Sequence, residues 1–128
     1  MADADTPSSP LPTATLQAVC AELGLPSDTW LMDFWRQHAG AWLVDQVVIY
    51  AIDDVQERNH TFEVAQYFPR QIAVGDDSGG RLILVDRLAD SGLWLVDAGS
   101  PSLDGAEHFD TLAQLAAAVG REHREPTQ

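Results

Sequence analysis

The sequence contains no lysine, has one cysteine, and lacks any long hydrophobic run. A single cysteine excludes an intrachain disulfide, and with it the disulfide-stapled folds of small secreted domains. No segment approaches the ~18 consecutive apolar residues that a membrane-spanning helix needs. The first residues are acidic and lack the apolar core of a signal peptide. We therefore expect a cytoplasmic protein.

Positive charge is also scarce, because 7 arginines face 20 acidic residues and give a net charge of −13. This balance disfavours nucleic acid and anionic membranes as partners, since both bind to cationic surfaces. It favours a basic protein partner, although an acidic surface also keeps a protein soluble without any partner.

What is present is enough for one independently folded domain, with 45% hydrophobic residues in 128. Residues 1–12 are rich in proline, serine, alanine and aspartate and show no apolar periodicity, so we expect a flexible segment there. The domain itself is expected over residues 13–120. Residues 121–128 are polar and are expected to form a flexible tail.

Two helices are expected at the start of the domain. Thr13 is a suitable N-cap for the first, Gly24 a suitable end, and the apolar spacing between them fits one helical face: Leu16, Val19, Cys20 and Leu23. Cys20 is therefore expected to be an inert core thiol, because a nucleophilic cysteine needs partial exposure and a nearby positive group. The second helix begins near Pro26, ends at Gly40, and carries an aromatic face that we assign to the core rather than to a ligand pocket: Trp30, Leu31, Phe34, Trp35 and His38.

The centre of the sequence predicts an antiparallel meander. Residues 71–86, QIAVGDDSGGRLILVD, hold two apolar runs around a glycine-rich turn, and a third apolar run follows at residues 93–96. The positive-φ positions of the turn are expected at Gly75, Gly79 and Gly80. Residues 47–50 predict a further strand at the edge of the sheet. About four strands are thus expected.

Short helices are expected on both sides of this meander. Residues 52–59 have an apolar and an acidic side, and residues 60–68 add another turn or two before Pro69. After the meander, Asp110 can cap a helix that ends at Gly120. Helices and antiparallel strands without regular βαβ alternation indicate an α+β fold.

No segment of the sequence specifies catalytic chemistry. Residues 75–80, GDDSGG, come close to the nucleophile motif of trypsin-like proteases, but a chain of this length with one cysteine cannot build the double barrel that those enzymes need. Asp76, Asp77 and Ser78 are instead expected to make Asx-type hydrogen bonds in the turn.

Metal binding is not specified either. Asp76 and Asp77 could form a site with Asp53 or Asp54, but no EF-hand loop or zinc spacing is present. We expect no metal, no cofactor and no enzymatic activity.

Several stretches are typical of one known family: residues 22–26 (ELGLP), the aromatic helix that ends at Gly40, the acidic segment 53–59 (DDVQERN), the turn 72–80 (IAVGDDSGG), the strand 94–97 (WLVD) and the helix at 111–119. In these features the chain resembles the SMI1/KNR4 domain, also called the SUKH superfamily, over roughly residues 13–120. The resemblance implies an SMI1/KNR4-like α+β fold and a binding function without catalytic residues.

Bacterial members of that family are mainly immunity proteins that neutralise polymorphic or contact-dependent toxin domains, often nucleases. The resemblance thus implies an immunity protein that binds a basic toxin domain, as a monomer or weak homo-oligomer. A regulatory or scaffold domain unrelated to toxins is the alternative. We expect the partner to contact an acidic face, an acidic loop and an aromatic residue at the exposed end of the second helix: Asp53, Asp54, Glu57, Asp76, Asp77 and Trp42.

Overall fold

The computed structural model describes residues 13–25, 29–44, 46–87, 92–97, 103 and 106–124. Over this part of the chain the elements are α1 (Thr13–Leu23), α2 (Leu31–His38), β1 (Trp42–Leu43), β2 (Val47–Ile49), α3 (Val55–Thr61), α4 (Val64–Tyr67), β3 (Gln71–Asp76), β4 (Arg81–Asp86), β5 (Leu93–Asp97), β6 (Glu107–Phe109) and α5 (Leu112–Arg124). The α+β class is confirmed. The expected segment at residues 1–12, the helix start at Pro26 and the last residues, 125–128, lie outside the described residues.

The sheet is antiparallel throughout, and its six described strands lie in the order in which they occur in the chain, β1 to β6. The meander of β3, β4 and β5 is confirmed. The expected number of about four strands is wrong, because β1 and β6 were not predicted. The edge position expected for residues 47–50 is also wrong, since β2 lies between β1 and β3.

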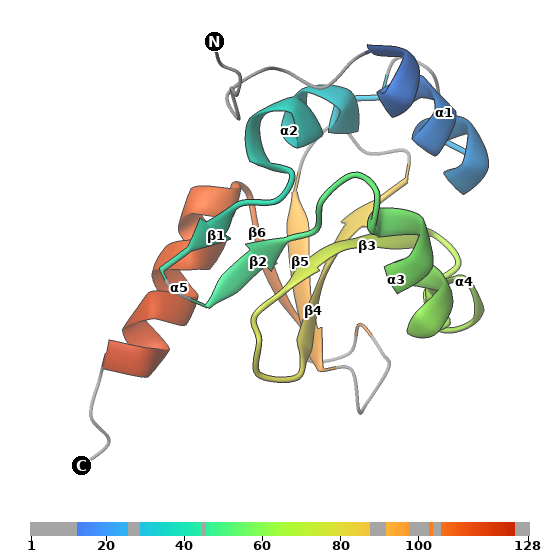
Figure 1. Cartoon of the computed structure of the whole chain (residues 1–128). Coiled ribbons are helices and arrows are strands. Elements are labelled where there is room, and N and C mark those ends of the chain that lie inside the picture. The colour runs from blue at the N-terminus through green and yellow to red at the C-terminus, as the bar shows by residue number, and fades with distance from the viewer. Residues whose placement is uncertain are drawn as a thin grey trace, which may run out of the picture.

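The middle of the sheet is buried on both faces. Successive side chains of a strand point to opposite faces, and residues 82–85 of β4 are all at most 3% exposed. In Figure 1, α1 and α2 lie together at one end of the sheet, α3 and α4 lie at one side, and α5 lies toward the side of β1 and β6. Contacts join α3 and α4 to β3, and α5 to β5 and β6. The apolar runs of β4 and β5 are therefore core strands.

The apolar faces of the two N-terminal helices enter this core as expected. Cys20 is 1% exposed and Trp35 is fully buried. Burial raises the pKa of the Cys20 thiol above its ordinary value, which disfavours the thiolate. Cys20 is thus a core side chain, and Leu31, Phe34 and Trp35 of α2 belong to the same hydrophobic core as the strands.

Glycines end two helices where they were predicted to do so, and one prediction failed. Gly24 has a φ of 74° and Gly40 a φ of 81°, a conformation that glycine adopts without steric cost. Gly120, however, lies inside α5, which continues to Arg124. Helix α5 thus extends four residues into the segment where the tail was expected to begin, at residue 121. A helical glycine costs only about 1 kcal/mol, which the burial of Val119 on the sheet side of α5 can offset.

Asn59 fastens α3 to the sheet with its side chain. Its amide donates to the carbonyl oxygens of Val55 and Ala73 at 2.8 and 2.9 Å, and its Oδ1 accepts from the N–H of Ala73 at 2.8 Å. Ala73 is fully buried, so its backbone groups need partners within the protein. The amide of Asn59 thus replaces a neighbouring strand and holds α3 beside β3.

Candidate functional site

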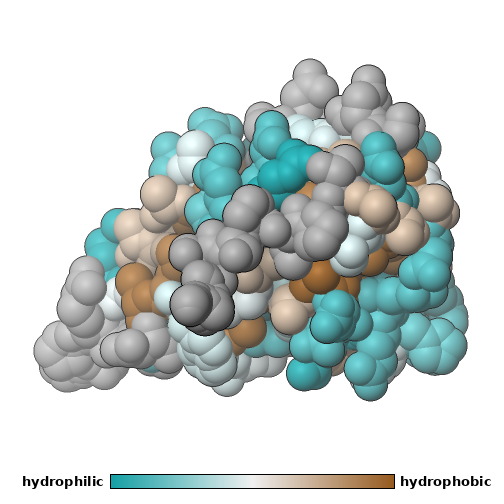
Figure 2. Space-filling view, turned by 45° about the horizontal axis from the view of Figure 1, so that its top comes forward, coloured by the Kyte–Doolittle hydropathy of each residue, from teal (hydrophilic) through white to brown (hydrophobic). Residues whose placement is uncertain are grey.

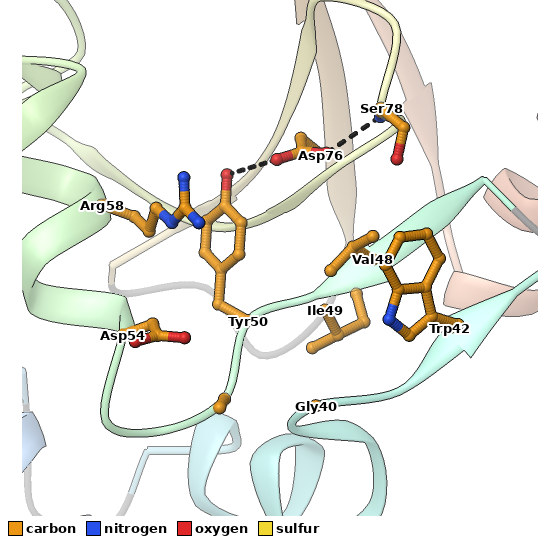
Figure 3. Close-up of a pocket in the computed structure, with 10 residues that line it drawn as sticks. Gly40, Trp42, Val48, Ile49, Tyr50, Asp54, Arg58, Asp76 and Ser78 are labelled. Atoms are coloured by element: carbon orange, nitrogen blue, oxygen red, sulfur yellow. Dashed lines mark hydrogen bonds between the residues drawn. The ribbon is translucent and has the colours of Figure 1, made fainter.

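An open groove of about 390 Å³ lies on the surface between the β1–β2 hairpin, the β3–β4 turn and α3 (Figure 3). Its lining combines apolar, aromatic and charged side chains: Gly40, Trp42, Val48, Ile49, Tyr50, Ala51, Asp54, Arg58, Asp76 and Ser78.

The pairing of three strands places the floor of the groove. Trp42 of β1 is opposite Val48 of β2, and Val48 is opposite Asp76 of β3. Side chains of directly opposed residues point to the same face of a sheet. Tyr50, two positions after Val48, continues this face. The strand pairing therefore brings together Trp42 and Asp76, which are more than thirty positions apart in the chain.

Tyr50 and Asp76 form the polar centre of the groove. The hydroxyl of Tyr50 donates a hydrogen bond to Oδ2 of Asp76 at 2.9 Å, and Tyr50 is only 4% exposed. Burial, followed by the charge of Asp76 and this hydrogen bond, raises the pKa of Tyr50 well above its ordinary value, while Arg58 acts in the opposite direction. Tyr50 is thus a protonated donor that orients the carboxylate of Asp76.

Helix α3 and the turn before it supply the charged wall. The guanidinium of Arg58 lies 5.4 Å from the centre of the Tyr50 ring, within the range of a cation–π contact. Figure 3 shows Tyr50 between Arg58 on one side and Val48 and Trp42 on the other. Asp54 precedes α3 and is exposed. The groove therefore presents two carboxylates and one guanidinium around an aromatic floor.

The turn between β3 and β4 is held by its own carboxylates, as expected. Oδ1 of Asp76 accepts from the N–H of Ser78 at 2.9 Å, and Oδ1 of Asp77 accepts from the N–H of Gly79 at 2.8 Å and of Arg81 at 3.0 Å. Nε of Arg81 donates to Oδ2 of Asp77 at 2.7 Å. This network fixes the position of Asp76 at the groove.

The backbone of this turn agrees with the prediction only at Gly80, since Gly75 and Gly79 were also expected at positive φ. The positive φ angles belong to Ser78 at 63° and Gly80 at 101°, and not to Gly75 or Gly79. Gly75 lies in β3, where a Cβ atom would come within 2.2 Å of the carbonyl oxygen of Val48. Gly75 is thus required for the close approach of β2 and not for the turn.

Ser78 has a structural partner rather than a catalytic one. Its Oγ donates to the backbone carbonyl oxygen of Gln46 at 2.8 Å, which ties the β3–β4 turn to the β1–β2 hairpin. The groove lining contains no histidine or cysteine. Among the described residues, no group of three or more histidine, cysteine, aspartate or glutamate side chains is placed to hold a metal ion.

The structure brings together three of the six residues expected to contact a partner: Trp42, Asp54 and Asp76 line the groove. Asp53 and Glu57 are exposed beside it, before and within α3. Asp77 is different, because it is 3% exposed and its carboxylate is engaged within the turn. Asp77 therefore stabilises the β3–β4 turn and does not present its carboxylate to a partner.

Trp42 was expected at the exposed end of the second helix, and its exposure agrees with that expectation while its secondary structure does not. Helix α2 ends at His38, and Trp42 belongs to β1, where it is 65% exposed. Sequence reasoning missed Tyr50, Arg58 and Ser78 as groove residues. The alternation of Val48 and Tyr50 was the available signal for Tyr50; the other two depend on how α3 and the β3–β4 turn pack.

Comparison of the chain with models of known protein families and with curated protein sequences found no match. No helix in the described ranges is sufficiently long and apolar to cross a membrane.

Figure 2 shows hydrophilic side chains gathered over the side of the molecule that carries α3 and α4. The groove beside α3 is therefore bordered by a polar surface, which includes the exposed acids Asp53 and Glu57.

Proposed function

We propose that this chain is a non-enzymatic protein-binding module, an immunity protein of the SMI1/KNR4 type that neutralises a basic toxin domain by direct binding in the cytoplasm. The observation that carries the proposal is the exposure of Trp42, 65%, at an open groove whose other walls include Asp54 and Asp76. Tryptophan is enriched among the few residues that dominate binding energy at interfaces. An exposed tryptophan beside two carboxylates favours a protein partner over a small apolar ligand.

The charge of the chain supports a basic partner. A nuclease toxin carries a cationic cleft for phosphates, and carboxylates can occupy that cleft in place of the phosphates. A net charge of −13 also attracts such a domain over distances comparable to the Debye length. The acids next to the groove would then both steer the partner and pair with its basic groups.

The proposal predicts that a neighbouring gene encodes a toxin domain, and co-expression with that domain tests it. A neighbouring gene without a toxin domain would favour the regulatory alternative. Cells that carry both genes are expected to grow, whereas cells that carry the toxin with an empty vector are not. Growth no better than with the empty vector would contradict the immunity function. Binding without protection would favour the regulatory alternative.

Charge reversal then tests the acidic face of α3. Replacement of Asp53, Asp54 and Glu57 by lysine changes the net charge from −13 to −7, because each reversal adds two charges. The association rate at low salt is expected to fall at least about tenfold, and its salt dependence to weaken. Stopped-flow fluorescence with a catalytically inactive toxin domain measures both.

The matched control reverses three exposed acids elsewhere: Glu22, Asp33 and Asp110. This variant has the same net charge of −7, since it also gains six charges. A smaller effect than that of the α3 variant is expected. Equal effects of the two variants would show that total charge matters and that the face beside the groove does not.

A further inference from the structure

The β1–β2 hairpin carries a strained apolar residue in its turn. Val44 has a φ of 46°, in the left-handed region that β-branched residues rarely adopt because the Cβ substituents crowd the backbone. Asparagine or glycine is the usual choice at such a position. The turn is closed by a hydrogen bond from the N–H of Gln46 to the carbonyl oxygen of Leu43 at 3.0 Å.

The side chain of Val44 is not a core side chain that would offset this strain. It is 42% exposed, so a large part of its apolar surface stays in contact with solvent. Backbone strain that packing within the protein does not offset is found mainly at functional positions. Val44 is therefore better explained by a contact with another molecule than by the stability of the hairpin.

Val44 follows the groove tryptophan by two positions in the same hairpin. Among the described residues, the large hydrophobic side chains that are exposed are Trp42, Val44 and Tyr67. Two of them belong to this hairpin, whereas Tyr67 is in α4, on the other side of the molecule (Figure 1). Trp42 and Val44 thus form an exposed apolar pair at the end of the sheet, which we call the hairpin anchor.

We propose that the hairpin anchor inserts into an apolar pocket of the partner protein, and that basic residues around this pocket face Asp54 and Asp76. This inference rests on the proposed function and adds the contact surface and the chemistry of the partner's site. Charge complementarity supports this occupant, because Trp42 of the anchor lines the same groove as the carboxylates of Asp54 and Asp76. β1 is two residues long, so it offers side chains to the partner and little backbone for an added strand.

A second copy of this chain is a less suitable occupant. The anchor of a second copy would bring another groove with the carboxylates of Asp54 and Asp76, and the two chains would each carry a charge of −13. Like charges that face one another across an interface oppose association.

The test measures affinity and thermal stability of the same variants. The probe is the inactive toxin domain encoded by the neighbouring gene, titrated by calorimetry. Trp42→Ala is expected to weaken binding about thirtyfold or more, as for a central aromatic residue of an interface. Val44→Asn is expected to weaken binding about fivefold, while its melting temperature without partner rises by about 3 °C because asparagine tolerates the positive φ.

Tyr67→Gln is the control, because it removes the exposed large hydrophobic residue of α4 and leaves the hairpin intact. Its affinity is expected to stay within twofold of wild type. If wild type binds and protects cells while Trp42→Ala and Val44→Asn bind equally well, the hairpin anchor is wrong and the immunity function stands. If wild type neither binds nor protects, both proposals fall.

Two further outcomes would overturn the anchor alone. One is a lower melting temperature for Val44→Asn, which would mean that valine stabilises the turn. The other is a wild-type dimer in sedimentation that Trp42→Ala dissociates, which would make a second copy the occupant.

Discussion

Asp77 shows how one side chain organises the turn that borders the groove. Burial alone would raise the pKa of its carboxyl group. The hydrogen bonds from the N–H groups of Arg81 and Gly79 and from the side chain of Arg81 outweigh that effect and lower the pKa below its ordinary value of 3.8. A carboxylate that accepts several N–H bonds is held in its charged form.

The pH dependence of stability should therefore include a contribution from Asp77. A depressed folded-state pKa stabilises the protein fully above the unfolded value of 3.8 and loses this effect as pH falls through the folded value. Asp77→Asn is expected to lower the free energy of unfolding at pH 7 by about 1–3 kcal/mol. The difference from wild type should narrow below pH 3.8. Urea denaturation followed by circular dichroism across pH 3 to 7 measures it.

The control for this prediction is Asp53→Asn, which removes the same charge from an exposed position. Its free energy of unfolding at pH 7 should stay within about 0.5 kcal/mol of wild type. A difference between Asp77→Asn and wild type that stays constant down to pH 3 would show that the hydrogen bonds do not depend on the charge of Asp77.

Gly75 of β3 and Gly79 of the β3–β4 turn belong to the same glycine-rich motif, but their structural roles differ. A Cβ atom on Gly75 would lie 2.2 Å from the carbonyl oxygen of Val48, closer than atoms can approach. A Cβ atom on Gly79 would lie 3.6 Å from Asp77, an ordinary contact, and Gly79 has no positive φ. Only Gly75 is therefore needed for the pairing of β2 with β3.

Alanine substitutions separate these tasks. Gly75→Ala is expected to lower the free energy of unfolding by about 3 kcal/mol, because β2 must move away from β3. Gly79→Ala should stay within about 0.5 kcal/mol of wild type. Chemical denaturation at neutral pH compares the two. A large loss for Gly79→Ala together with a small one for Gly75→Ala would show that the turn and not the strand pairing limits stability.

The strands also show what sequence reasoning can recover. The runs of β3, β4 and β5 were predictable because long apolar segments between turn residues indicate buried strands. β1 and β6 have two and three residues, too few to show a periodic pattern. Their position, and hence the interior position of β2, depends on tertiary pairing. The end of α5 was mispredicted because burial of the helix outweighed the preference of Gly120 for a helix end.

The groove was recoverable only in part for the same reason. Trp42, Asp54 and Asp76 were candidates because of their chemistry, but their common location follows from the pairing of β1, β2 and β3. Arg58 belongs to the groove through the packing of α3 beside β3, which the amide of Asn59 maintains, whereas Tyr50 continues the face of Val48 at the end of β2. Residue type can thus indicate the kind of surface, while its shape depends on contacts between distant segments.

Charge acts on the whole molecule in two opposite ways. With 20 acidic residues and 7 arginines, the folded chain repels itself, because folding brings the carboxylates closer together than they are in the unfolded chain. The same excess attracts a basic partner. Salt screens both interactions, so it should stabilise the free protein and weaken the complex.

A salt titration tests this opposition. An increase of NaCl from about 20 to 300 mM shortens the Debye length from ~20 to ~6 Å. We expect the melting temperature of the free protein to rise by about 2–5 °C, while the association rate with the inactive toxin domain falls at least about tenfold. The lysine variant of Asp53, Asp54 and Glu57 has a net charge of −7 and should show a smaller change in both quantities. A melting temperature that falls with salt would mean that ion pairs such as Arg81–Asp77 outweigh the repulsion. In that case the repulsion between carboxylates would not limit the stability of the free protein, and the acidic surface would matter mainly for association.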